Sequence, residues 1–186
     1  SSKLYRDYAS TQDRSLDDDK LSHQAWVSKY FSYHMLPHLP KNLDAKILDI
    51  GCGHGKYLIE LQRHGYHQSY GIDISESQIE SAKATYGLNN IERNEPLAFL
   101  KNQKANWDCI FLIDILEHLE TGYLIDLMQQ AYTSLKPGGC VIVQVPNGIS
   151  PMSPYFPSDI THVRAFSVFS LEQTFRKGGF EAFCFF

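Results

Sequence analysis

The feature that most constrains this chain is a set of three alternating glycines directly after a short apolar segment. The run reads Ile47-Leu48-Asp49-Ile50-Gly51-Cys52-Gly53-His54-Gly55. Glycine permits tight turns and lets the backbone approach a ligand closely. The backbone N–H groups at the start of a following helix would then face an anionic ligand group. The run therefore predicts a strand that carries an acid near its end, a ligand-binding loop and a helix, in that order.

Three ligand-binding patterns compete for this loop. A dinucleotide fingerprint, G-x-G-x-x-G, requires glycine at position 56, where the chain has Lys56. A phosphate-binding G-x-x-x-x-G-K-[ST] loop requires glycine at position 50 and Ser or Thr at position 57, where the chain has Ile50 and Tyr57. The pattern acid-x-G-x-G-x-G fits from Asp49 to Gly55 without a mismatch. A glycine-rich turn that binds no ligand is the alternative.

Strand and helix patterns alternate along the rest of the chain. Ser75 with Gln78, and Ser170 with Gln173, have the spacing of capping boxes at two helix starts. Apolar runs predict strands at 46–50, 69–74, near 91, at 107–113 and at 140–145, with helices at 21–36, 56–64, 75–86, 123–135 and after 170. Near-continuous apolar strands in this order predict an α/β fold with a mainly parallel sheet and helices on both faces. A ligand should then sit beyond the carboxyl ends of the strands.

The segments after these strands resemble the motifs of one family in order and spacing. They are the glycine loop, Asp73 after the second strand, Asn94-Glu95-Pro96-Leu97 after the third, Asp108 to His118 at the fourth, and Leu135-Lys136-Pro137-Gly138-Gly139 before the fifth. Together they are similar to the class I S-adenosylmethionine-dependent methyltransferases from Leu43 to about Phe180. The resemblance implies a Rossmann-like, doubly wound sheet. It also implies S-adenosylmethionine as cofactor and S-adenosylhomocysteine as product.

The same resemblance implies where the cofactor binds. Asp49 would orient the glycine loop or meet the ammonium group of the cofactor, and Asp73 would accept hydrogen bonds from the ribose hydroxyls. Glu95 stands at the adenine-side position, where the family more often has Asp. The implied cofactor-binding residues are Asp49, Gly51, Cys52, Gly53, Gly55, Asp73, Ile74, Glu95, Pro96 and Asp114. We expect residues 43–186 to form this domain and residues 1–42 to form a helical lid or cap, with Arg14 as a candidate contact for the cofactor carboxylate.

The acceptor side is predicted from a long, proline-rich stretch, 146–162, after the last of these strands. Loops of this length are usually functional or disordered. Its Asp159-Ile160-Thr161-His162 resembles a segment of methyltransferases encoded with glycan-assembly enzymes. Our hypothesis is that His162 acts as a general base or orients the acceptor, with Asp159 tuning it, while the alternative is that both only pin the loop. His118 is a further catalytic candidate, which either faces the acceptor or caps a helix.

The leading interpretation is therefore an enzyme that moves a methyl group to a small-molecule or glycan hydroxyl. One alternative is a cofactor-binding domain of a larger protein without turnover of its own. Another is methylation of a different small-metabolite nucleophile. A nicotinamide-dependent oxidoreductase conflicts with Lys56 in the glycine loop. The sequence names neither the acceptor, the methylated atom nor the oligomeric state.

Charge and composition exclude several other classes of protein. A net charge of −4 and a pI near 6.0 disfavour a nucleic-acid partner, and no apolar run reaches the roughly 18 residues of a membrane span. Four cysteines without a C-x-x-C pair predict reduced thiols in a cytoplasmic protein. His34 and His38 flank Pro37 with no acid nearby, so the sequence predicts no metal site.

The end of the sequence carries a separate prediction about the sheet. Residues Phe180 to Phe186 include four phenylalanines and fit a sixth strand. In the family the sixth strand pairs with an antiparallel seventh, for which no residues remain. We therefore expect a truncated chain or a shortened sheet. Otherwise the exposed edge would be covered by a second copy of the chain, as in a homodimer, or by a missing downstream segment.

Overall fold

The computed structural model describes residues 18–149 and 159–185. The first part of the expected lid, with Arg14, lies outside the described residues. So does most of the proline-rich stretch, from 150 to 158.

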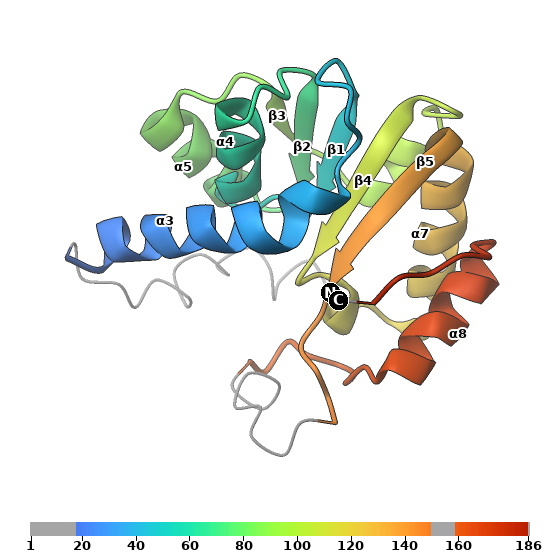
Figure 1. The fold of residues 1–186 in the computed structure, drawn as a ribbon. Helices are drawn as coiled ribbons and strands as arrows, with labels where there is room; N and C mark the ends of the chain where they lie inside the picture. The colour runs from blue at the N-terminus through green and yellow to red at the C-terminus, as the bar shows by residue number, and fades with distance from the viewer. Residues whose placement is uncertain (1–17, 150–158, 186) are drawn as a thin grey trace.

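Five strands form a single sheet in which each neighbouring pair runs parallel. The strands are β1 (Ile47–Ile50), β2 (Ser69–Asp73), β3 (Ile91–Arg93), β4 (Trp107–Ile113) and β5 (Leu135–Gln144). Their order across the sheet is β3-β2-β1-β4-β5, which Figure 1 shows from one side. The chain therefore moves outward from β1 and then crosses back to β4. In open sheets of this kind a ligand binds at such a reversal, beyond the carboxyl ends of the strands. The predicted doubly wound, parallel α/β fold is confirmed.

Helices separate the strands along the chain and cover the sheet on both faces. They are α3 (Asp18–Tyr30) with its continuations η1 (Phe31–Met35) and η2 (Leu36–His38), then α4 (Lys56–Arg63), α5 (Glu76–Tyr86), α6 (Pro96–Leu100), η3 (Leu116–His118), α7 (Thr121–Ser134) and α8 (Val168–Gly178). No helix within the described residues is long and apolar enough to cross a membrane.

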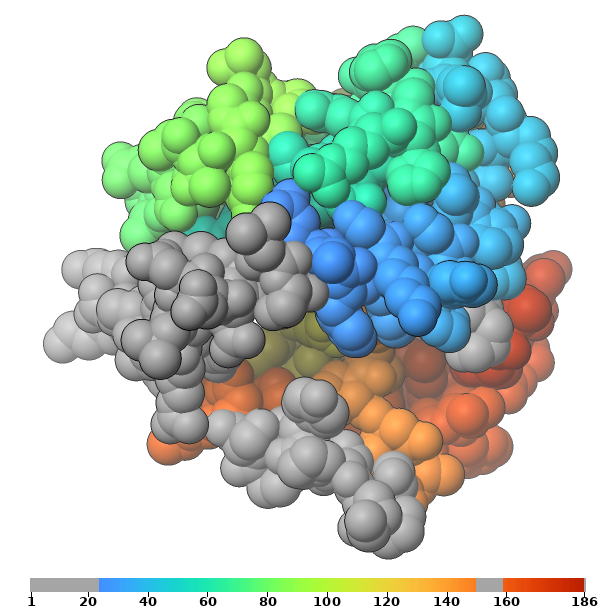
Figure 2. Space-filling model, turned by 60° about the vertical axis from the view of Figure 1, so that its left-hand side comes forward, coloured from blue at the N-terminus to red at the C-terminus, as the bar shows by residue number. Residues whose placement is uncertain are grey.

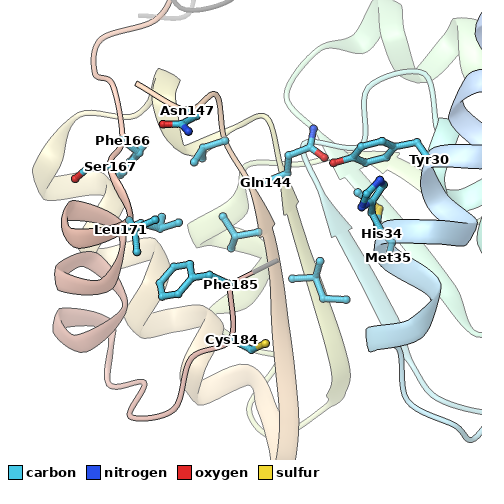
Figure 3. A pocket seen from close by; sticks show the side chains of 14 residues that line it. Tyr30, His34, Met35, Gln144, Asn147, Phe166, Ser167, Leu171, Cys184 and Phe185 are labelled. Atoms are coloured by element: carbon cyan, nitrogen blue, oxygen red, sulfur yellow. The ribbon is translucent and has the colours of Figure 1, made fainter. Parts of the chain in front are cut away.

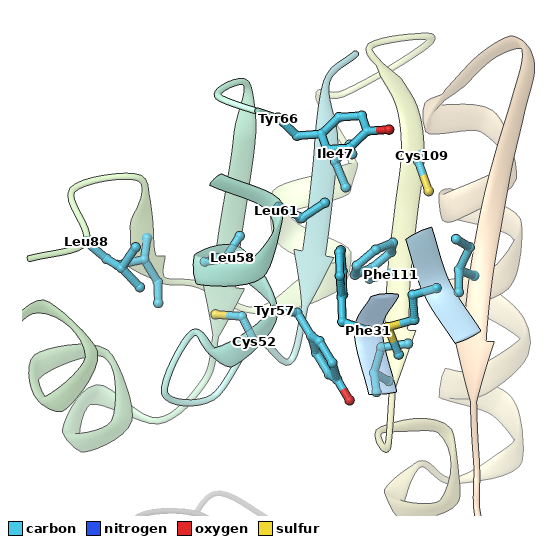
Figure 4. Packing of buried hydrophobic residues seen from close by; sticks show 14 of the residues in the cluster. Phe31, Ile47, Cys52, Tyr57, Leu58, Leu61, Tyr66, Leu88, Cys109 and Phe111 are labelled. Atoms are coloured by element: carbon cyan, nitrogen blue, oxygen red, sulfur yellow. The ribbon is translucent and has the colours of Figure 1, made fainter. Parts of the chain in front are cut away.

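Two hydrophobic clusters hold these layers together, one on each face of the sheet. On the first face α3, η1, α4 and α5 pack over β1 and β4. Figure 4 shows the ring of Phe31 beside that of Tyr57, which in turn meets Phe111 edge-on; the ring centroids lie 6.3 and 6.4 Å apart. On the second face α6, α7 and α8 pack over the same strands. The described part of the predicted lid therefore shares the core of the sheet, and its role as a lid stays a prediction.

The predicted cap of α5 is wrong in detail. The side chain of Ser75 makes no capping hydrogen bond. Its backbone N–H donates to Asp73 Oδ1 at 2.8 Å instead, and its hydroxyl lies 3.1 Å from that of Ser77. The Gln78 side chain, which the capping box would need, is directed at the glycine loop, because its Oε1 lies 2.6 Å from where a Cβ on Gly53 would be. Contacts of Ser75 with its neighbours Asp73 and Ser77 thus take the place of the predicted capping box.

The start of α8 also differs from the prediction. Ser167 is the N-cap and shares a capping box with Ser170, one turn before the predicted Ser170–Gln173 pair. The Gly148 N–H donates to Phe166 O at 2.9 Å, and this non-local contact sets where the chain enters the helix. Similarly, β5 begins at Leu135 rather than Cys140, and its pairing with β4 shifts in register between Trp107 and Cys109.

The predicted sixth strand is wrong for residues 180–185, which have no regular secondary structure. Gly179, at φ +101°, turns the chain back over α8. The rings of Phe180 and Phe183 then pack against Phe175, with centroids 5.6 and 5.7 Å away. Burial of these aromatic rings against the helix therefore takes the place of pairing along β5.

Candidate active site

A cavity of about 990 Å³ lies at the carboxyl ends of the strands. Every strand from β1 to β4 contributes to it at or just after its end. Its walls include Gly51, Gly53, Asp73, Ile74, Ser75, Gln78, Asn94, Glu95, Pro96, Asp114, Ile115, His118, Tyr123, Ile160 and Thr161. Figure 2 shows one side of the molecule, on which the blue surface of α3 lies next to the green surfaces of α4 and α5.

The glycine loop between β1 and α4 is tied to the neighbouring strand by its backbone. The N–H of Gly51 donates to Ile72 O at 2.9 Å, and that of Gly53 donates to Asp73 Oδ2 at 2.9 Å. Gly51 and Gly53 have φ values of +74° and +53°, in the region that side chains disfavour. A Cβ on Gly51 would also lie 2.9 Å from Ile115 Cδ1. Both the conformation and the space at this turn therefore require glycine.

Asp73 ends β2 and lies on the wall of the cavity. Both of its oxygens are engaged, Oδ1 by the N–H of Ser75 and Oδ2 by that of Gly53. Each carboxylate oxygen can accept more than one hydrogen bond. Burial raises the pKa of Asp73, while the two backbone N–H groups act against that rise. Asp73 is therefore held in one orientation and keeps acceptor capacity for a ligand in the cavity.

Asp49 lies in β1, behind the loop, and is 1% exposed. Among the described residues its Oδ2 has no hydrogen-bond partner. Burial raises the pKa of Asp49 to about 7, with Lys56 lowering it and Asp73 raising it further. A buried carboxylate with an unmet oxygen indicates a site that a cationic group would complete.

The adenine-side position, Glu95, is the N-cap of α6. Its carboxylate accepts hydrogen bonds from the N–H groups of Leu97 and Ala98, at 3.2 and 2.7 Å. It also accepts one from the hydroxyl of Tyr123 on α7. Glu95 thus lines the cavity, and its carboxylate oxygens are engaged in hydrogen bonds to α6 and α7. A role in binding adenine stays a prediction.

Asp114 follows β4 at the mouth of the cavity. Its φ of +53° is unusual for a residue other than glycine. The side-chain amide of Gln144 at the end of β5 donates to both of its carboxylate oxygens, at 3.0 and 3.1 Å. Backbone strain of this kind clusters at functional sites, where surrounding contacts maintain it.

Beyond Asp114 a chain of polar side chains forms the other end of the cavity. The Thr161 hydroxyl donates to Asp159 Oδ1 at 2.6 Å and lies 2.8 Å from Nδ1 of His118. The Thr161 N–H donates to the same carboxylate oxygen at 2.8 Å. Burial and the nearby His162 ring lower the pKa of His118, so its imidazole is neutral near pH 7.

Glu117 and His162 lie directly behind His118. The rings of His118 and His162 meet at a centroid distance of 4.7 Å. Nε2 of His162 lies 3.9 Å from Glu117 Oε1, and Nε2 of His118 lies 4.0 Å from the same oxygen. Burial raises the pKa of Glu117 to about 8, and the charges of Asp114 and Asp159 add to the rise.

The cavity thus brings together most of the residues that the sequence singled out. Seven predicted cofactor residues line it: Gly51, Gly53, Asp73, Ile74, Glu95, Pro96 and Asp114. Asp49, which lies in β1, and Cys52 and Gly55, which belong to the loop itself, do not line the cavity. Of the catalytic candidates only His118 lines it, whereas His162 packs behind His118 and Asp159 accepts hydrogen bonds from Thr161.

Sequence reasoning did not single out Glu117, Thr161 or Tyr123 as site residues. Glu117 carries a signal, because a charged residue next to a candidate histidine at a strand end is a natural partner for it. Thr161 lies inside the Asp159–His162 segment, so its position could also have been marked. Tyr123 reaches Glu95 only through the packing of α7 on α6, and no local pattern in the sequence indicates that contact.

A second cavity, of about 300 Å³, lies along β5 away from these residues. Figure 3 shows Tyr30, His34 and Met35 on one side of it and Leu171 and Phe185 on the other, with Gln144 between them. None of the predicted site residues lines it.

The sequence of this chain matches those of known methyltransferases. A family model described as a methyltransferase domain matches residues 23–184. A ubiquinone biosynthesis O-methyltransferase of Rickettsia bellii is 31% identical over 107 residues, which cover 56% of this chain and 43% of that protein. A tRNA U34 carboxymethyltransferase of Vibrio cholerae is 28% identical over 123 residues, covering 64% of this chain and 38% of that protein. The chain therefore spans less than half the length of these curated relatives.

Among solved structures, the chain resembles a SAM-dependent methyltransferase from Archaeoglobus fulgidus. The TM-score is 0.71 at 26% sequence identity, and the match covers 85% of this chain and 69% of that one.

Proposed function

This chain belongs to the class I S-adenosylmethionine-dependent methyltransferases, and from that premise we propose that it methylates a hydroxyl oxygen of a small molecule or glycan. The observation that carries the proposal is a polar cluster at one end of the cavity, in which His118 and Thr161 line the cavity and Glu117, His162 and Asp159 contact them from behind. A hydroxyl must lose its proton as it is methylated, and such a cluster can receive that proton.

The residues around the glycine loop fit the cofactor of this family. The unmet, buried Oδ2 of Asp49 suits the ammonium group of the amino-acid tail, directly or through water. The loop leads into α4, whose N-terminal N–H groups suit the carboxylate. Asp73 retains acceptor capacity for the ribose hydroxyls, and the 41% exposed side chain of Ile74 offers an apolar surface to the adenine ring.

When bound, S-adenosylmethionine supplies an electrophilic methyl group on a sulfonium and is released as S-adenosylhomocysteine. The protein has to place the acceptor oxygen in line with that group and remove its proton, because positioning supplies much of the rate in reactions of this kind. We assign the positioning and proton removal to the cluster around His118. Asp114, which has a positive φ and accepts hydrogen bonds from Gln144, lines the same cavity.

An acceptor panel with S-adenosylmethionine tests the proposal. Hydroxylated aromatic compounds, glycosides with free hydroxyls, the matching amines and tRNA are each incubated with the protein, and formation of S-adenosylhomocysteine is measured. We expect turnover with hydroxyl acceptors and none with the matching amines. Turnover with amines or tRNA alone would contradict the proposal. Tight cofactor binding without any product would favour the alternative of a cofactor-binding domain.

A further inference from the structure

Three potential metal ligands meet at the acceptor end of the cavity. One ligand atom from each of Glu117, His118 and His162 lies within 4.8 Å of the others. The closer pairs join Glu117 Oε1 to Nε2 of each histidine, at 3.9 and 4.0 Å. Ligand atoms around a tetrahedral zinc ion lie about 3.4 Å apart, as bond lengths of about 2.0–2.2 Å require. Each glutamate–histidine pair would have to shorten by roughly half an ångström, and the two histidine ligand atoms would have to approach by up to about 1.4 Å, to close the set around one ion.

Glu117 shows a second sign of a missing ligand. Its side chain is 1% exposed, and its Oε2 has no hydrogen-bond partner among the described residues. A buried polar atom without a partner costs free energy, more so if it is charged. A cation bound beside it would satisfy this oxygen.

The hydrogen bonds behind His118 prepare its ring for a metal. The Thr161 hydroxyl has a single hydrogen, which it donates to the Asp159 carboxylate. The hydroxyl must therefore accept from Nδ1 of His118, which lies 2.8 Å away. In the neutral ring this leaves the lone pair on Nε2, the nitrogen that faces Glu117. Metal-binding histidines characteristically have the other ring nitrogen oriented by such a partner.

Backbone hydrogen bonds hold the segment that carries His162 next to the segment that carries Glu117 and His118. The N–H groups of Val163 and Arg164 both donate to the carbonyl oxygen of Glu117, at 2.9 and 3.3 Å. The Arg164 guanidinium donates to the Thr121 hydroxyl at 3.1 Å. These bonds place His162 against η3 although the two segments are distant in the sequence.

We propose that Glu117, His118 and His162 bind one divalent transition-metal ion of the zinc type. Two histidines and one glutamate are the ligands of an open, catalytic zinc site, in which a fourth position remains for substrate. The inference rests on the proposed function, because that position would take the acceptor oxygen. The bound ion would lower the pKa of the hydroxyl. With the three side chains bound to the metal, the hydroxyl proton would pass to solvent instead of to the cluster, the oxygen–carbon bond would form, and the carbon–sulfur bond would break with its electron pair left on sulfur.

Metal content tests the proposal directly. The purified chain is stripped with a chelator, dialysed against Zn²⁺ and measured by mass spectrometry for zinc per chain. We expect about one zinc ion per chain, and loss of that ion in Glu117→Gln, His118→Ala and His162→Ala. The matched controls are His67→Ala and Glu80→Gln, which change exposed residues far from the cluster and should keep the zinc. S-adenosylhomocysteine binding by every variant verifies that it is folded.

A milder variant tests the positioning role of Thr161. Thr161→Val keeps the shape of the side chain but removes the hydroxyl that joins Asp159 to His118. We expect zinc affinity to fall about 10–100-fold, the range for loss of an orienting partner. Substitution of Co²⁺ for Zn²⁺ should give a visible absorption band in the parent chain and a shifted or weaker band in this variant.

These outcomes separate the metal site from the proposed function. Absence of zinc in the folded parent chain, or equal zinc content in the parent and all three ligand variants, would overturn the metal site. Methyl transfer to hydroxyls that persists in the chelated protein would also overturn it, and would leave the proposed function standing. Stoichiometric zinc with no turnover on any hydroxyl would support the metal site and count against the proposed function.

Discussion

The two ends of the active-site cavity are built in different ways. The cofactor end uses short stretches after β1, β2 and β3, in which the backbone of one strand end holds the next, as between Gly53 and Asp73. The acceptor end joins η3 to residues 159–164, which meet only because the chain returns to the sheet after β5. The first kind of site follows from motifs at successive strand ends, whereas for the second the sequence shows two separate segments, 108–118 and 159–162, without showing that they meet. We therefore expect mutations at the cofactor end to weaken cofactor binding, and mutations at the acceptor end to lower the rate of methyl transfer.

His118→Ala is expected to give the largest difference between the loss of methyl transfer and the loss of cofactor affinity. Removing this ring should lower the rate of methyl transfer by about 100-fold or more, as loss of a catalytic group does. The affinity for S-adenosylhomocysteine, measured by calorimetry, should change less than about twofold, because its expected contacts lie at the other end. His67→Ala is the control. A parallel loss of cofactor affinity would show that the two ends are one coupled site.

Asp73→Asn is expected to have the opposite effect, weakening cofactor binding while leaving the acceptor end intact. We expect affinity for S-adenosylhomocysteine to fall about 100-fold, since a hydrogen bond to a charged group contributes about 1.5–3 kcal/mol and Asp73 would accept two. Asp126→Asn, an exposed acid on α7, is the matched control. If zinc content stays unchanged in Asp73→Asn, the acceptor end is independent. Cofactor affinity within threefold of the parent chain would remove Asp73 from the ribose site.

The pH dependence of cofactor binding gives a smaller effect. Burial raises the pKa of Asp49 to about 7, so below that pH the free protein carries a neutral Asp49. A cationic cofactor requires the ionised form, and binding must then release a proton. Affinity for S-adenosylmethionine should therefore fall as the pH decreases from 7 to 5.5, by up to about tenfold per pH unit. In Asp49→Asn the same titration should be flatter, and an equally steep one would assign the effect to another group.

The smallest expected effects are changes in stability and cofactor affinity when either of two glycines with positive φ is replaced by alanine. Gly53→Ala and Gly87→Ala should each lower the free energy of unfolding by about 1–2 kcal/mol, because alanine is strained in the left-handed region. Gly87 has no atom within 4 Å of an added Cβ, whereas at Gly53 that Cβ meets Gln78 Oε1 at 2.6 Å. Only Gly53→Ala should also weaken cofactor binding. Chemical denaturation and calorimetry measure the two quantities, and an equal loss of affinity in both variants would contradict the assignment.

Local patterns account for the parts of the fold that sequence reasoning predicted well. β4 was predicted at its observed bounds because its unbroken apolar run, Cys109 to Ile113, can be recognised without information on its partners. The cap at Ser167 and the path of residues 180–185 were predicted wrongly, because each is decided by a contact with a distant segment. For example, Phe180 and Phe183 pack against the ring of Phe175 on α8, and the chain therefore does not pair with the edge of β5.

The amino-acid sequence by itself determined the order of strands and helices, the glycine loop and the acids at the strand ends. Each of these follows from periodicity or backbone conformation within a few residues. Only the tertiary structure decided that His118 faces the cavity with His162 behind it, and that Glu117 lies buried between them and the sheet. The physical reason is that burial and proximity depend on which distant segments share a strand end. That same reason explains why no spacing of ligands in the sequence indicated a metal site.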